Sequence, residues 1–218
     1  ENASIAKLIS GALFPLGLIM VLMTGAELFT GNCLMLISLM ERRIRPGGML
    51  RNLALVYAGN FAGSLLLAWA IRAFSGPYMA DGLVLKIIST AAAKCALPFG
   101  GAVGLGVLCN ILVCIAIMMA LCAENAVGRA AGVFGPICCF VICGFEHCVA
   151  NMYYIPAGLL ALTLPNAGAV VAAAGVDISA LTWGNFLLGN LLPVTVGNLL
   201  GGFGFALLIW GAHRERPA

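Results

Sequence analysis

A polar cluster inside a long apolar stretch constrains this chain more than any other feature of its sequence. The cluster, residues 144–151, places a carboxylate, an imidazole and an amide within the apolar segment 130–164. An ionisable side chain at bilayer depth costs at least about 3 kcal/mol, so such a residue usually belongs to a functional site. The alternative is a helix break capped by polar side chains, but Glu146 next to His147 is more than a cap requires.

The composition indicates a membrane protein. Hydrophobic residues make up 62% of the 218 residues and charged residues 9%, whereas soluble domains carry about a quarter charged residues. We therefore expect an all-α integral membrane protein in contact with the lipid bilayer, with residues 1–218 as a single transmembrane channel domain. The net charge is only +3 and the basic residues lie between the apolar segments, so no nucleic-acid partner is expected.

Two of the five apolar segments are much too long for a single span, since a helix needs about 20 residues to cross the hydrocarbon core. Each of these two is interrupted by a polar cluster, at residues 24–27 in the first and 144–147 in the fourth. Non-helical backbone at membrane depth is tolerated only where it lines a cavity or is buried in protein, so we predict two broken transmembrane helices. The five segments are residues 9–40, 53–71, 95–123, 130–164 and 183–212.

The basic residues predict the orientation. Positive residues favour the cytoplasmic side, and the more basic side includes the C-terminal tail, so we expect the C-terminus in the cytoplasm. Five spans that end inside must begin outside, and the chain starts at Glu1 without a signal-peptide pattern, so we expect a first helix to be missing from this sequence. The more basic side carries Arg42, Arg43, Arg45, Arg51, Arg129, Arg214 and Arg216, and the other side Lys7, Arg72, Lys86 and Lys94.

The two halves of the chain repeat one polar pattern. Glu27 and Asn32 have the same spacing as Glu146 and Asn151, and a pair of asparagines follows each break. The two units begin on opposite sides of the membrane, so the repeat is inverted, and inverted repeats with broken helices place the permeation site near the midplane. The asparagine pairs are Asn52 with Asn60 and Asn190 with Asn198, again with equal spacing.

Several side chains near the breaks have chemistry that suits a permeating solute. His147 can change charge near neutral pH, which suits proton exchange with the anion of a weak acid. Lys94 attracts anions, or it is an interfacial lysine whose ammonium extends to water. We expect Glu27 and Glu146 to brace the broken backbone. Neutral hydrogen bonds are offered by Thr30, Asn110, Asn151 and Asn198, and apolar constrictions by Phe14, Leu18, Leu28 and Phe140, although each of these alone is more often simple packing.

The nine cysteines indicate packing rather than chemistry. Nearly all lie within apolar segments and none forms a C-x-x-C pair, so they are best explained as small side chains between helices. Cys143, His147 and Cys148 form the one cluster with metal-binding chemistry. No second cysteine pair accompanies it, so we expect no metal and no cofactor.

Four stretches of the chain resemble the signature sequences of the formate/nitrite transporter family. They are residues 25–32, 108–114, 145–152 and 192–198, which occur in the family's order and span nearly the whole chain. Ile155 and Pro156 resemble the formate and hydrosulfide channels more than the nitrite branch. The resemblance implies an aquaporin-like homopentamer in the bacterial inner membrane, with a pore in each protomer and six spans where this chain has five.

The resemblance also implies roles for individual residues. His147 matches the central pore histidine with Thr30 across from it, and Lys94 matches the vestibule lysine that draws anions inward. The other matches are Leu18 and Leu28 at the cytoplasmic constriction, Phe14 and Phe140 at the outer constriction, and Asn110 and Asn198 near the pore.

The first functional hypothesis is a passive or proton-linked channel for small monovalent anions such as formate, hydrosulfide or nitrite. Donation of a proton by His147 would ease passage as the neutral acid. The second hypothesis is a pore for a neutral solute such as water on the same fold, which has no use for Lys94. A membrane enzyme with a metal at the cysteine–histidine cluster is the third, and it lacks a complete ligand set. We therefore expect the protein not to be an enzyme.

Overall fold

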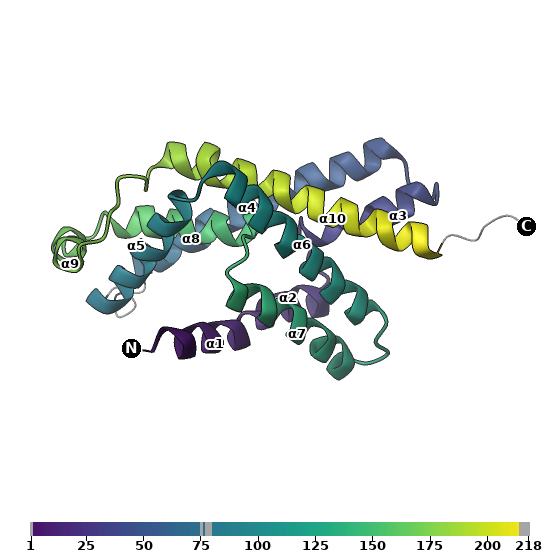
Figure 1. Ribbon diagram of the computed structural model, residues 1–218, viewed down its shortest axis with the longest axis horizontal. Coiled ribbons are helices and arrows are strands. Elements are labelled where there is room, and N and C mark those ends of the chain that lie inside the picture. Colours follow the sequence, from purple (N-terminus) through teal and green to yellow (C-terminus); the bar gives the residue numbers. More distant parts are fainter. Residues whose placement is uncertain (1, 75, 77–79, 214–218) are drawn as a thin grey trace, which may run out of the picture.

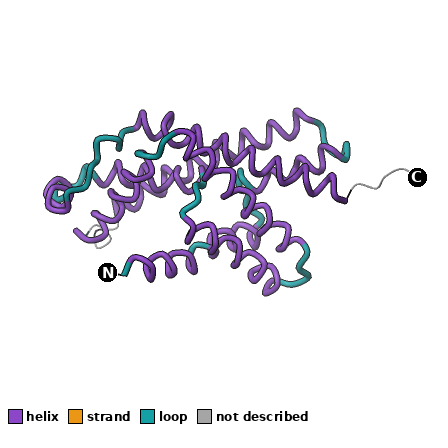
Figure 2. Tube along the Cα trace, viewed as in Figure 1, coloured by secondary structure: helices purple, strands orange, loops and turns teal. Residues whose placement is uncertain are grey.

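The computed structural model describes residues 2–74, 76 and 80–213, and every regular element within them is helical (Figures 1 and 2). One element, η1, is a 3₁₀-helix, and another, η3, is a π-helix that runs directly into the last helix. In chain order the elements are α1 (Ala3–Leu13), α2 (Pro15–Thr24), η1 (Gly31–Leu34), α3 (Met35–Met40), α4 (Pro46–Phe74), α5 (Asp81–Cys95), α6 (Phe99–Leu121), α7 (Ala126–Cys143), α8 (Cys148–Ala161), α9 (Ala167–Ala174), η3 (Asn185–Leu191) and α10 (Leu192–His213).

Five helical stretches of the described chain are long and apolar enough to cross a membrane, which confirms an all-α membrane fold. They are Ser4–Thr24, Pro46–Phe74, Phe99–Leu121, Ala126–Cys143 and Asn185–His213, and two shorter apolar helices follow the first and the fourth. Large apolar side chains such as Leu50, Leu66 and Leu208 remain exposed on the outer faces. Such continuous apolar exposure is typical of surfaces that face lipid or another subunit.

Both predicted helix breaks are present at the predicted places. α2 ends at Thr24 and α7 at Cys143, and the next residue in each case is a glycine with left-handed backbone, Gly25 at φ 72° and Gly144 at φ 73°. Glycine adopts this conformation without steric cost, so it ends a helix where another residue would be strained. The chain then continues as a short helix on the far side of each break, which confirms the repeated architecture.

A helix that the hydropathy pattern did not predict carries one of the candidate residues. α5 contains Asp81, Lys86 and Lys94, so it lacks the long uncharged run by which the other helices were recognised. It packs against α8 and α9, and its buried face includes Val84 and Ile88. The last turn of α5 holds Lys94 beside the second break.

Small residues bring α6 and α10 into the closest contact in the fold. A Cβ atom on Gly106 would meet the carbonyl oxygen of Val194 at 2.9 Å, and one on Gly197 would overlap the carbonyl of Val103. Gly106 and Gly197 therefore serve close packing of the two helices. Figure 1 shows α7, α1 and α2 on the opposite side of α6 from α10. Buried apolar side chains of α2, α6 and α7 form one of the two core clusters.

Candidate functional site

His147 begins α8 and joins the two helix breaks. Its Nδ1 atom accepts a hydrogen bond from the backbone N–H of Ala150 at 3.1 Å, and its Nε2 atom lies 3.0 Å from Oγ1 of Thr30 in the first break. A backbone N–H can only donate, so Nδ1 is the unprotonated nitrogen of a neutral ring and Nε2 carries the hydrogen. The Nε2–H group therefore donates to the threonine hydroxyl. The His147 side chain is 6% exposed.

Two cavities meet at this histidine. The histidine cavity has a volume of about 330 Å³, and His147 is the one polar side chain in its lining. The lysine cavity has a volume of about 200 Å³ and is lined by Thr90, Lys94, Glu146 and Tyr154 among others. The two share Phe14, Phe140, His147 and Ala150 in their walls, so a solute that moves from one cavity to the other passes these residues.

The boundary between the cavities is aromatic. The rings of Phe14 and Phe140 meet edge to face with their centroids 5.4 Å apart, and the ring of Phe140 stacks on the imidazole of His147 at 6.0 Å. On the far side of this pair, Leu18 and Leu28 line the histidine cavity. The aromatic pair therefore narrows the route beside His147, the one polar side chain that lines the histidine cavity.

Lys94 and Glu146 form an ion pair in the lysine cavity. The Lys94 Nζ atom lies 2.8 Å from Oε1 of Glu146, and the two side chains are 17% and 6% exposed. The ammonium also lies 5.7 Å from the ring centroid of Tyr154. Because the two opposite charges are in contact and largely shielded from water, the positive field of Lys94 is mostly cancelled beyond the cavity itself.

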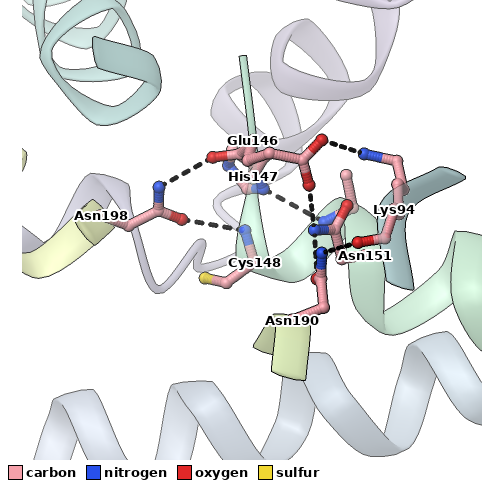
Figure 3. A network of polar contacts seen from close by, with 8 residues as sticks. Lys94, Glu146, His147, Cys148, Asn151, Asn190 and Asn198 are labelled. Carbon is pink, nitrogen blue, oxygen red and sulfur yellow. Dashed lines mark hydrogen bonds and ion pairs between the residues drawn. The ribbon is translucent and has the colours of Figure 1, made fainter. Parts of the chain in front are cut away.

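Asparagine side chains hold the backbone of the second break (Figure 3). Asn198 accepts from the N–H of Cys148 at 2.9 Å and donates to the carbonyls of Glu146 and Gly106 at 3.0 and 2.8 Å. Asn110 donates to the backbone carbonyl of Asn198 at 2.6 Å. The bonds to Cys148 and Glu146 satisfy buried backbone groups that the helix break leaves unpaired. The bonds to Gly106 and Asn198 join α6 to α10.

A second amide layer holds the glutamate of that break. Asn151 donates to Oε2 of Glu146 at 2.6 Å and to Oδ1 of Asn190 at 2.7 Å, while Asn190 donates to the backbone carbonyl of Lys94 at 2.8 Å. The carboxylate is therefore fixed by Asn151 on one oxygen and by Lys94 on the other. We expected the glutamates to brace the backbone directly through its N–H groups. At the second break Asn198 binds the backbone instead, and Glu146 orients the side chains of Asn151 and Lys94.

The first break repeats the main hydrogen bonds of this arrangement. Asn60 accepts a hydrogen bond from the N–H of Phe29 and donates one to the carbonyl of Glu27. Asn198 does the same at the second break, with the N–H of Cys148 and the carbonyl of Glu146. Asn32 donates to Glu27 and to Asn52, as Asn151 does to Glu146 and Asn190. The predicted pairing of the two halves is thus confirmed by equivalent hydrogen bonds. The charges differ, because Glu27 is exposed and no ion pair to it occurs among the described residues.

The candidate residues fall into two groups. Those that line the cavities are Phe14, Leu18, Leu28, Phe140, His147, Lys94 and Glu146. The others use their polar atoms within the protein: Thr30 binds His147, while Asn110, Asn151, Asn198 and Glu27 belong to the networks at the breaks. None of this second group lines the two cavities, so their part is to position the cavity walls rather than to offer hydrogen bonds to a solute.

Two polar cavity residues were not predicted from the sequence. Thr90 and Tyr154 line the lysine cavity from α5 and α8. Helical spacing would have indicated both. Thr90 lies one turn before Lys94 on one face of α5, and Tyr154 lies two turns after His147 on one face of α8. Thr90 was missed because α5 itself was not predicted.

The cysteine–histidine cluster does not assemble into a metal site. Cys143 is exposed, Cys148 is buried, and both ring nitrogens of His147 are engaged in hydrogen bonds. Within residues 2–74, 76 and 80–213, no group of three or more histidine, cysteine, aspartate or glutamate side chains is arranged to hold a metal ion.

Comparison with known proteins identifies the family. The sequence model described as "Formate/nitrite transporter" matches residues 1–211. The formate channel FocA of Haemophilus influenzae is 40% identical over 202 residues, covering 91% of this chain and 71% of that protein. The formate channel FocA of Escherichia coli K12 is 39% identical over 204 residues, covering 90% and 70%.

A solved structure described as a pentameric formate channel with formate bound has the same fold. It matches with a TM-score of 0.83 at 33% identity, and the match covers 96% of this chain and 83% of that one. The chain therefore belongs to the formate/nitrite transporter family, whose members are multi-pass membrane transport proteins and not enzymes.

Proposed function

We propose that this protein is a channel for small monovalent anions, with formate as a substrate and hydrosulfide and nitrite as further candidates. The observation that carries the proposal is the pair of cavities that meet at His147 across the Phe14–Phe140 contact. The names of the similar proteins, formate channels in two bacteria, support formate in particular. Passage is passive or linked to protons.

The chemistry of the histidine cavity favours a solute that sheds its charge. Apart from His147, the walls of that cavity are apolar side chains such as Leu18, Val113 and Ile137, together with the small residues Gly17 and Ala150. A bare ion in such surroundings loses its hydration, and His147 is the one side chain in the wall that can offer a hydrogen bond in return. The cost is about that of burying an unpaired charge, which is several kcal/mol or more. Formic acid, being neutral, crosses the same walls at far lower cost. His147 is the polar side chain in these walls, and its Nε2–H binds the anion there by exchanging its hydrogen bond to Thr30 for one to the anion.

Proton donation by His147 has a structural requirement. The ring holds its hydrogen on Nε2, so it can transfer that proton to a formate oxygen and remain neutral only if Nδ1 has first taken a proton from water. Nδ1 is occupied by the N–H of Ala150, so protonation displaces this helix cap, at a cost of about 1 kcal/mol. The proton on Nε2 then passes to the carboxylate, and the ring is left neutral with its hydrogen on Nδ1.

We further propose that residues 1–218 form one channel domain within a homopentamer of the bacterial inner membrane, with the C-terminus in the cytoplasm. The pentameric assembly described for the similar formate channel supports the oligomer. The exposed apolar faces of the helices, such as that bearing Leu66 and Leu208, supply surface for lipid and for neighbouring protomers. The excess of arginine in the loop after α3 and in the tail supports the orientation.

The test is solute flux into proteoliposomes that contain the purified protein, with protein-free vesicles as the control. Formate, hydrosulfide and nitrite are supplied separately across a range of pH, and water permeability is measured by light scattering in the same vesicles. We expect formate flux well above the control. Water flux without flux of any of the three anions would instead support a neutral-solute pore, and Lys94→Ala would then leave that flux unchanged.

A further inference from the structure

We propose that α5 carries an additional anion-binding site, centred on Lys86, which takes small monovalent carboxylates before they reach the lysine cavity. This inference rests on the proposed function. A third cavity, which we call the α5 cavity, has a volume of about 300 Å³ and is lined by Ser10, Lys86, Thr90, Tyr153 and Tyr154 among others. Its wall is more polar than those of the histidine and lysine cavities, because it contains the ammonium of Lys86 and hydroxyl groups from α1, α5 and α8.

The α5 cavity adjoins the lysine cavity. Thr90 and Tyr154 line both, so the two cavities adjoin at these side chains. The lysine cavity in turn shares Phe14, Phe140 and His147 with the histidine cavity. Three successive cavities therefore lead from Lys86 to His147.

The spacing on α5 explains this alignment. Lys86, Thr90 and Lys94 are separated by four residues each, so they follow one another along one side of the helix. With about 1.5 Å of rise per residue, the two lysines are roughly 12 Å apart along the axis. An anion can pass from one ammonium to the other over that distance without leaving the helix surface.

Charge distinguishes the two lysines. Lys94 is neutralised by Glu146 at 2.8 Å, so the pair acts on a distant anion as a dipole, whose field falls off faster than that of a single charge. Lys86 has no ion-pair partner in the described part of the chain. Asp81 on the same helix lies roughly 140° around the axis from Lys86 and is bound by Asn166. Lys86 therefore supplies the uncompensated positive charge along the route.

The site selects by charge rather than by shape. The Thr90 hydroxyl donates its hydrogen to the backbone carbonyl of Lys86 at 2.7 Å, so it cannot also donate to an anion. The ammonium of Lys86, which is exposed, is left as the charged donor of the cavity wall. Binding through one solvated ammonium is weak, and its effect is to raise the local concentration of the anion at low ionic strength.

The experiment measures formate influx into right-side-out and inside-out membrane vesicles with the wild-type protein, Lys86→Gln and Lys86→Arg. The matched control is Arg129→Gln, which removes one exposed positive charge at the opposite end of the membrane, beyond the 23 residues of α6. At low salt and sub-saturating formate, we expect Lys86→Gln to reduce influx about threefold or more in one vesicle orientation only. KM should rise, the maximal rate should stay within about twofold, and the difference should shrink in high salt.

The outcomes separate this inference from the proposed function. Lys86→Arg should restore the wild-type rate, and Arg129→Gln should not reproduce the defect in the affected orientation. If wild-type vesicles transport formate but Lys86→Gln behaves like the wild type at low salt in both orientations, the site does not exist. A loss of maximal rate that persists in high salt and is not rescued by arginine shows a structural role and also overturns the inference. If the wild type carries no formate, the proposed function itself fails.

Discussion

Nε2 of His147 lies 3.0 Å from Oγ1 of Thr30, although the two residues are 117 positions apart in the sequence. Each residue belongs to one of the two helix breaks, so this hydrogen bond links the two breaks directly. Because Nδ1 is held by Ala150, the hydrogen on Nε2 is directed at Thr30 in the first break. The wider networks around the breaks keep these two side chains in register.

Removal of Lys94 should destabilise the protein because it leaves a buried carboxylate without its counter-ion. We expect Lys94→Met to lower the free energy of unfolding by about 3 kcal/mol or more, and Lys94→Met combined with Glu146→Gln to recover most of that loss. The measurement is the unfolding midpoint of the purified protein in detergent. A single Lys94→Met variant as stable as the wild type would contradict a buried, paired Glu146.

The two bracing asparagines should differ in importance although they make equivalent bonds. Asn198 is fully buried and serves Cys148, Glu146 and Gly106, whereas Asn60 is partly exposed. Asn198→Ala should cost about 3 kcal/mol because buried backbone groups lose their partners, and Asn60→Ala about 1 kcal/mol because water can replace the amide. Unfolding measurements on both variants test this, and equal losses would show that burial does not set the cost.

Close packing between α6 and α10 should tolerate no added methyl group at its centre. A Cβ atom on Gly197 would overlap the backbone carbonyl of Val103, which cannot rotate away. Gly197→Ala should therefore reduce the yield of folded protein or its unfolding midpoint, by an amount corresponding to about 2 kcal/mol or more. Gly104→Ala on α6 is the control, since a Cβ there meets nothing within 4 Å. Similar behaviour of the two variants would count against this packing.

The aromatic pair should limit the size of the solute. Phe140→Ala removes the ring that separates cavities of about 330 and 200 Å³, so flux of a larger monocarboxylate such as lactate should increase relative to formate. Phe134→Ala on the same helix is the control, because the Phe134 side chain is 46% exposed on the outer face. Flux ratios in proteoliposomes provide the readout, and an unchanged ratio for Phe140→Ala would exclude this residue from the constriction.

Much of the architecture is predictable from the sequence because membrane burial leaves a strong signal. The clusters around Glu27 and Glu146 break segments that are otherwise uniformly apolar, and Gly25 and Gly144 supply the left-handed residue that each break needs. The asparagines could be paired in advance because the repeat preserves their spacing. Their equivalent bonds at Asn60 and Asn198 then follow from the symmetry of the fold.

The sequence was less informative about α5 and about the roles of individual amides. α5 is only 15 residues long and contains charged side chains, so it does not stand out as a long apolar segment. Thr90, which lies on α5, was therefore not identified either. Whether an asparagine faces a solute or the backbone depends on rotation about a few bonds, which spacing does not record. For this reason Asn110, Asn151 and Asn198 could be identified as special but not as bracing residues.

The central claim, that the solute passes His147 and exchanges a proton there, is tested most directly by the pH profile of formate flux in His147→Asn. Asparagine can still accept the hydrogen bond from Ala150 as a helix cap, but it does not titrate. In the wild type we expect flux to rise as the pH falls, because more His147 rings then hold a second proton to donate. The variant should lose this step, and an unchanged pH profile in a folded variant would contradict the account.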